Sequence, residues 1–153
     1  MPTVKFELQS TLAPDAVLGA LTDFGPSRAD VWPNVDSEHF QVHDQGPGWA
    51  DVTEGSSVAG GVWERERYGW DAAAHTVAIE TLDSNTWGPG SRWEYKLTPG
   101  SAGGTRVAVT VVRNGKGWKG RLIGAGLAVA GTGMLRSQME QALARISPLR
   151  GSG

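Results

Sequence analysis

The sequence predicts an α+β fold: a seven-stranded, curved antiparallel sheet wrapped around one long C-terminal helix, with two short helices between strands one and two. Three observations predict it. Seven segments alternate apolar and polar residues, as half-buried strands do. Short turn sequences join the last six of these segments, and short connections make neighbouring strands antiparallel. Residues 118–146 carry apolar side chains at helical spacing.

The first strand is predicted over residues 3–9, where every second residue is apolar. A helix follows over residues 14–24, because Pro14 suits a first helical turn, in which its missing N–H costs little. A second, short helix over residues 27–32 is expected to end before Pro33, since the residue before a proline avoids helical geometry.

Six strands are then predicted in succession. Each has apolar residues on one face and polar residues on the other, and they cover residues 38–43, 49–54, 62–68, 75–82, 92–98 and 105–113. This alternation indicates a sheet with one covered face. The long helix is the obvious cover, and a curved sheet would leave a space beneath it. Glycine-rich stretches between the strands favour such bending.

The long helix has two unlike halves. Residues 122–135 contain no charge, and the following residues are amphipathic up to Pro148, which should end the helix. About 14 apolar residues are too few to span a bilayer, which takes roughly 20, so no stable membrane insertion is expected. The glycines at 124, 126, 131 and 133 indicate either close packing on the sheet or empty volume for a ligand. A single domain over 1–149 and a disordered tail over 150–153 are expected.

Composition excludes several classes of function. The net charge is −2 and no basic run occurs, so nucleic acid is not an expected partner. There is no cysteine, hence no thiol chemistry. His39 and His43 share a strand face opposite Phe40 and Val42 and lack a third ligand, so no metal site is expected. No phosphate-binding glycine motif is present and no cofactor is expected. The polar N-terminal strand favours a cytoplasmic protein.

The strand over residues 62–68 carries the most chemistry. One face holds Trp63, Arg65 and Arg67, and the other holds Glu64, Glu66 and Tyr68. A hairpin symmetric about Ala72 would place the Trp/Arg face inside, whereas a one-residue slip would place the Glu face inside. An inward Arg65 could hold a ligand carboxylate or enolate. An inward Glu64 or Glu66 could act as a general base with a raised pKa. The candidate catalytic residues are Arg65 and Glu66; pairing of the inward charges near a rim is the structural alternative.

Aromatic residues supply the candidate pocket lining, because large apolar rings line most small-molecule sites. Each can equally be a packing residue of the core. The candidate ligand-binding residues are Trp32, Trp63, Arg65, Trp87, Trp93 and Tyr95, with Leu127 from the long helix.

With these elements in order, the chain resembles the START/Bet v1-like superfamily, also called helix-grip or SRPBCC (polyketide cyclase/dehydratase-like) proteins. The element order over 4–146 carries the resemblance, together with local sequences at 20–24, 32–33, 64–71 and 104–107. The resemblance implies a cavity between sheet and long helix that holds a hydrophobic small molecule. It implies no particular activity, because the superfamily includes carriers, receptors, cyclases and chaperone regulators.

Three functions therefore remain open. The first is a bacterial protein, monomeric or homodimeric, that binds a hydrophobic or aromatic small molecule. The second is a polyketide cyclase or dehydratase acting in the same cavity. The third is a partner-binding regulator, which would have a filled core and an exposed apolar patch.

Overall fold

The computed structural model describes residues 3–32, 35–56 and 61–151, without the side chains of 127–130 and 147–151. Its elements are β1 (Thr3–Ser10), α1 (Pro14–Leu21), α2 (Arg28–Val31), β2 (Gln41–Gly46), β3 (Trp49–Ser56), β4 (Val62–Asp71), β5 (Thr76–Ser84), β6 (Arg92–Pro99), β7 (Thr105–Val112) and α3 (Gly117–Gly151). The predicted α+β helix-grip architecture is therefore confirmed.

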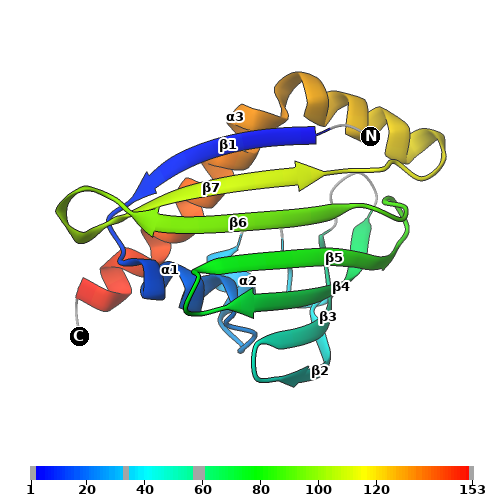
Figure 1. Ribbon diagram of the computed structural model, residues 1–153. Helices are drawn as coiled ribbons and strands as arrows, with labels where there is room; N and C mark the ends of the chain where they lie inside the picture. The colour runs from blue at the N-terminus through cyan, green and yellow to red at the C-terminus, as the bar shows by residue number, and fades with distance from the viewer. Residues whose placement is uncertain (1–2, 33–34, 57–60, 152–153) are drawn as a thin grey trace.

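The seven strands form one antiparallel sheet in the order β1-β7-β6-β5-β4-β3-β2 (Figure 1). Sequential hairpins join β2 through β7, and β1 pairs with β7. The sheet curves, and α1, α2 and α3 lie on its concave side (Figure 1). Both ends of β2 differ from the predicted range 38–43, because the strand ends at Gly46 and begins only at Gln41. His39 belongs to a preceding turn in which its imidazole contacts Asp36 at 2.6 Å.

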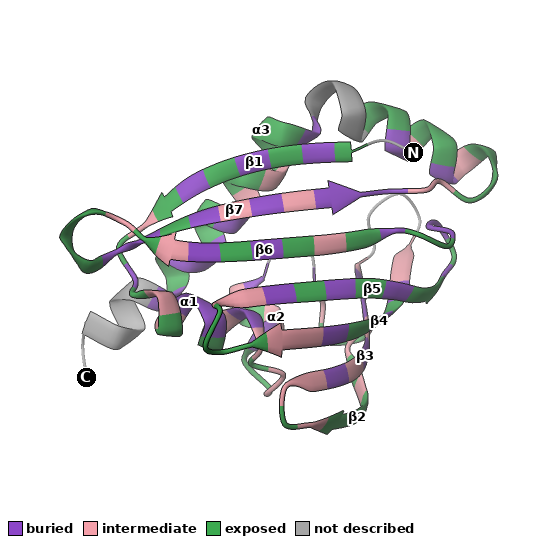
Figure 2. Ribbon diagram, viewed as in Figure 1, coloured by how far each residue is buried: buried purple, intermediate pink, exposed green. Residues whose placement is uncertain are grey.

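The core lies where the C-terminal half of α3 covers β1, β7 and the short helices. Alternate strand residues point inward, and Figure 2 shows buried and exposed residues alternating along β1 and β5. From α3 come Met139, Ala142, Leu143 and Ile146, spaced three or four residues apart on one helix face. This half of the helix behaves as its amphipathic sequence predicts.

The helix α3 is longer than expected. It continues through Pro148 to Gly151, so the predicted end at Pro148 was wrong. A proline in a helix removes one hydrogen bond, and in the last turn few further bonds depend on it. In Figure 1 the two halves of α3 run in different directions. Among the described residues, no helix is long and apolar enough to cross a membrane. The tail expected over 150–153 lies partly outside the described residues, and the domain limit at 149 stays a prediction.

The β4–β5 hairpin has a different centre from the one expected. Asp71 pairs with Thr76, so the turn is residues 72–75 and the hairpin is centred between Ala73 and Ala74, not on Ala72. The Asp71 carboxylate accepts hydrogen bonds from the backbone N–H groups of Ala73 and Ala74, which stabilises this longer turn. Tyr68 therefore faces Ile79, whereas a hairpin symmetric about Ala72 would place Arg65 opposite Ile79. The register differs from that pairing by three residues, which is an odd number. Such a shift exchanges the faces of the whole strand.

Candidate functional site

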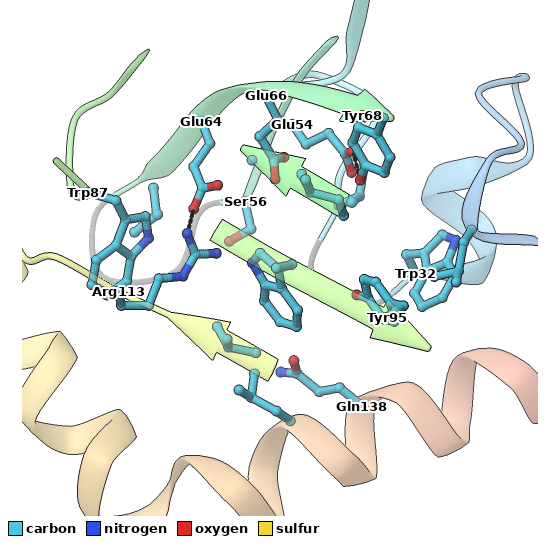
Figure 3. A pocket seen from close by; sticks show the side chains of 18 of the residues that line it. Trp32, Glu54, Ser56, Glu64, Glu66, Tyr68, Trp87, Tyr95, Arg113 and Gln138 are labelled. Atoms are coloured by element: carbon cyan, nitrogen blue, oxygen red, sulfur yellow. Dashed lines mark hydrogen bonds and ion pairs between the residues drawn. The ribbon is translucent and has the colours of Figure 1, made fainter. Parts of the chain in front are cut away.

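A cavity of about 280 Å³ lies between the concave face of the sheet and α3. Side chains from α2, β3, β4, β6, β7 and α3 point into it (Figure 3). Its wall includes the half-buried Ser56 and Val62 and the exposed Met134, so the mouth opens between the β3–β4 end and α3. The protein's own tryptophans line this space without filling it.

Strand β4 supplies the polar wall. Its side chains alternate, so Glu64, Glu66 and Tyr68 point inward and are 7%, 6% and 4% exposed. Glu54 on β3 stands directly opposite Glu64. Three carboxyl groups therefore approach one another in a space with little water, which is unfavourable unless cations or protons compensate them.

The first compensating cation is Arg28, which α2 places at one end of the cavity. Its Nε and Nη2 donate to the two Glu54 carboxylate oxygens at 3.3 and 3.1 Å. Nη1 donates to the backbone carbonyls of Leu21 and Asp23, and Nη2 also donates to the Tyr68 hydroxyl at 2.7 Å. These five bonds use all five N–H groups of a guanidinium. Arg28 therefore ties α1, α2 and the sheet together and has no donor left for a ligand.

The second cation is Arg113, which follows β7 at the other end. Its Nη1 lies 2.8 Å from the Glu64 carboxylate (dashed in Figure 3). Its guanidinium carbon lies 5.0 Å from the centre of the Trp87 ring and 5.3 Å from that of Trp93, within range of a cation–π attraction. Unlike Arg28, Arg113 bonds only through Nη1 among the described residues. Arg113 is part of the cavity lining, which leaves its other N–H groups as candidate donors to a ligand.

Glu66 lies between these two ion pairs. No Lys, Arg or His of the described chain is within salt-bridge distance of it. Burial raises the pKa of Glu66 well above 4.5, and the neighbouring Glu64 and Glu54 charges raise it further, against the opposing effect of Arg113. A hydrogen bond with Glu64 also favours the protonated form. Burial and the neighbouring carboxylates thus favour the protonated, carboxylic acid form of Glu66 beside Glu64.

The charges of the wall then balance. Arg28 with Glu54 and Arg113 with Glu64 make two neutral pairs, and protonated Glu66 adds no charge. Burial also raises the pKa of Tyr68 and of Tyr95, so both hydroxyls keep their protons. The Tyr68 hydroxyl donates to Glu54 at 2.5 Å. The cavity thus presents apolar rings, a neutral acid and the N–H groups of Arg113.

Five of the residues selected from sequence line the cavity. They are Trp32, Glu66, Trp87, Trp93 and Tyr95. The alternative base Glu64 lines it as well, but as the partner of Arg113. Leu127 belongs to α3, where the structure does not describe the side chains of residues 127–130.

Arg65 and Trp63 do not reach the cavity. Arg65 is on the outer face of β4, where its Nε and Nη2 donate to the Asp51 carboxylate at 2.9 and 2.7 Å. Of the two registers that the sequence left open, the structure has the one with the Glu face inward, because the hairpin turn is longer than the symmetric turn about Ala72. An arginine on this face cannot hold a ligand in the cavity.

The glycines of α3 do not shape the cavity either. Gly126 and Gly133 are exposed, and a Cβ at either position would meet no atom within 4 Å. Gly124 and Gly131 are buried, but neither is among the described residues that line the cavity. The close approach occurs at Gly120, where a Cβ would lie 2.3 Å from the Thr86 carbonyl oxygen.

Sequence reasoning missed that polar residues from distant segments, of which it had named only Tyr68, come together in one wall. Arg28, Glu54, Tyr68 and Arg113 are on four different elements or loops, and no spacing in the sequence connects them. Arg113 had one visible signal: it ends an apolar strand whose inward positions are all valine. Within the described ranges, no three His, Asp or Glu side chains gather as a metal ion would require.

No protein-family model and no curated protein matches the sequence. Solved structures do match. An aromatase/cyclase from a Streptomyces species is 18% identical with a TM-score of 0.71, covering 94% of each chain. A START superfamily protein from Mycobacterium smegmatis is 12% identical with a TM-score of 0.73, covering 97% of this chain and 99% of that one. A major latex-like protein from Panax ginseng is 11% identical with a TM-score of 0.65, covering 94% and 95%.

These neighbours share one architecture, and at such identities the likeness concerns the fold. It covers nearly the whole chain. The chain therefore has the START/Bet v1-like, or SRPBCC, fold.

Proposed function

We propose that the protein binds a hydrophobic or aromatic small molecule in the cavity between the sheet and α3. The observation that carries this proposal is an interior space of about 280 Å³ that the chain's own side chains leave open. A well-packed interior has few voids larger than a water molecule, so an opening of this size in the middle of the fold favours a ligand-binding role.

The walls favour a flat, largely apolar molecule. Trp32, Trp87, Trp93 and Tyr95 come from three separate segments, and on β6 Trp93 stacks on Tyr95 with ring centres 6.1 Å apart. Aromatic walls contribute large apolar contact area with little conformational entropy to lose. Ile79 and Val111 add apolar area on the sheet.

Two polar groups would orient the ligand. Arg113 offers N–H groups to the cavity, and Glu66 offers a carboxylic acid. Both donate hydrogen bonds, so they favour a ligand with a carbonyl, ether or phenolic oxygen. A ligand carboxylate is disfavoured, because both arginines are already neutralised by glutamates and the added charge would lie beside Glu64.

The test is a titration with the neutral dye N-phenyl-1-naphthylamine, whose emission rises in apolar surroundings. Gln138 on α3 lines the cavity, whereas Gln141, one helical turn later, is exposed. The variant Gln138→Phe should fill the space and weaken dye binding at least tenfold, while Gln141→Phe should bind as the wild type does. No dye binding, or equal binding by both variants, would reject the proposal.

A second candidate is an enzyme of the cyclase/dehydratase type, which Glu66 favours. A carboxylic acid at this place can protonate a departing hydroxyl, which leaves as water. The adjacent Glu64 carboxylate can accept the proton lost from the neighbouring carbon. One of the structural neighbours, the Streptomyces aromatase/cyclase, is consistent with such chemistry. The partner-binding regulator is not retained, because it required a filled interior.

The enzyme candidate is tested with 4-hydroxy-4-phenylbutan-2-one, whose dehydration gives a conjugated enone that is followed by absorbance. The wild type should accelerate the reaction over buffer, and Glu66→Gln should abolish the acceleration while still binding the dye. The control is Glu80→Gln, which replaces an exposed glutamate on β5. If the wild type gives no acceleration, or Glu66→Gln keeps it, this candidate falls and the binding proposal stands unaffected.

A further inference from the structure

The first half of α3 exposes large apolar side chains. Trp118 is 77% exposed, Leu122 is 64% exposed and Met134 is 49% exposed. Among the described residues, only Leu82 is a comparable exposed hydrophobic outside this helix. Trp118 and Leu122 are four residues apart and so lie on one side of the helix. Trp118 and Leu122 therefore form one exposed apolar pair at the start of α3, and such a pair marks a binding site more often than single exposed residues do.

The same segment carries only positive charge. Lys116, Lys119, Arg121 and Arg136 are its charged residues, and no Asp or Glu occurs between 115 and 139. The segment therefore has a charge of +4. The remaining ten cations and sixteen acids give −6 for the rest of the chain, which accounts for the net −2. Of the four cations, Lys119 is half-buried and the others are exposed.

The segment is placed where it can meet a flat surface. Figure 1 shows the start of α3 beyond the β1 edge of the sheet, and Figure 2 shows most of it in the exposed colour. It also borders the cavity: Ile123 lines the cavity beside outward-facing Leu122, and Met134 is both exposed and part of the lining. A surface that covered this part of α3 would therefore lie next to the cavity mouth.

We propose that Lys116 and the first part of α3, up to Arg136, dock on an anionic lipid membrane. Helices that lie in the membrane interface combine Lys or Arg with Trp and Leu, and Trp is favoured at the headgroup level. A second copy of this chain is a poorer occupant, because a twofold dimer through this face would bring the same four cations together. Docking would present the cavity mouth to the lipid, from which an apolar ligand could enter without crossing water.

Cosedimentation of the full chain with lipid vesicles tests the docking. Vesicles of phosphatidylcholine with 30% phosphatidylserine should bind the protein, pure phosphatidylcholine should bind it far less, and 0.5 M salt should release it. Each cation near an anionic membrane contributes roughly a fivefold factor in partitioning. The double variant Lys119→Gln/Arg121→Gln should therefore bind roughly thirtyfold more weakly, and Trp118→Ala roughly tenfold more weakly.

The matched control is Arg92→Gln/Arg106→Gln, which removes the same charge from the outer face of the sheet, where both side chains are about half exposed. It should bind vesicles within twofold of the wild type. Equal losses in both double variants, or binding that ignores phosphatidylserine, would overturn the proposal. So would a concentration-dependent dimer, by sedimentation velocity, that Trp118→Ala dissolves. Vesicle binding needs no dye, so its failure is distinct from a failure of the ligand proposal.

Discussion

Replacing Glu66 by glutamine should change how stability depends on pH. Glutamine has the shape of the protonated acid and cannot ionise, so it keeps the hydrogen-bonding geometry beside Glu64 at every pH. The pKa of Glu66 is raised above 4.5 in the folded protein, by burial first and by the neighbouring carboxylates second. The folded state therefore binds a proton that the unfolded chain releases above about pH 4.5.

The sign follows from linkage. Where the native state binds more protons than the unfolded state, the free energy of unfolding falls as pH rises. The stabilisation by this proton is complete below 4.5 and is lost as pH rises through the folded pKa. The loss is at most about 1.4 kcal/mol for each pH unit in that window. The difference in stability, Glu66→Gln minus wild type, should therefore increase from pH 5 to pH 8.

Urea unfolding of both proteins at pH 5, 6, 7 and 8, followed by circular dichroism, measures this difference. Glu80→Gln, at an exposed position on β5, should keep the wild-type slope. Taking the difference between variants removes the contribution of all other titrating groups. A constant difference between Glu66→Gln and wild type over this range would show that Glu66 is ionised in the folded protein, and both its proton and the proposed acid would be wrong.

Three further predictions concern stability and access. Arg28→Met should cost about 3–5 kcal/mol of unfolding free energy, because it leaves the buried Glu54 carboxylate without its cation, and adding Glu54→Gln should recover part of that loss in urea unfolding. Gly126→Ala should raise the free energy of unfolding by about 1 kcal/mol, since its Cβ enters open space; Gly120→Ala should lower it, since its Cβ would meet a backbone oxygen at 2.3 Å. Arg65→Ala should leave dye affinity unchanged, because the Arg65 side chain is on the outer face of the sheet. A lower dye affinity in this variant would contradict that placement.

Sequence patterns predicted the elements well because their signals are local. Alternation marks strands, helical spacing marks the second half of α3, and turn residues mark the hairpins. The same locality explains the error at β4. Whether Arg65 or Glu66 points inward depends on whether the β4–β5 turn has an odd or an even number of residues. The hydrogen bonds that the Asp71 side chain accepts fix the length of this turn, and they produce no periodic pattern in the sequence.

The site was predictable in its aromatic part and not in its charged part. A tryptophan in a fold of this kind is a reasonable candidate for a cavity wall on size alone. The ion pairs join residues far apart in the chain: Arg28 with Glu54, and Glu64 with Arg113. Such partners become visible only when the sheet brings the strands together. Once they are paired, Glu66 is the carboxyl group left to carry a proton.

The indole N–H signals of the tryptophans offer the most direct test of the central claim, which is that a small apolar molecule occupies the cavity. The chain has seven tryptophans, of which Trp32, Trp87 and Trp93 line the cavity and the other four do not. Titration of ¹⁵N-labelled protein with N-phenyl-1-naphthylamine should shift the three lining signals and leave the other four in place. If no signal moves, or if the signals that move belong to Trp49, Trp63, Trp70 or Trp118, the proposed binding of an apolar molecule in the cavity is contradicted.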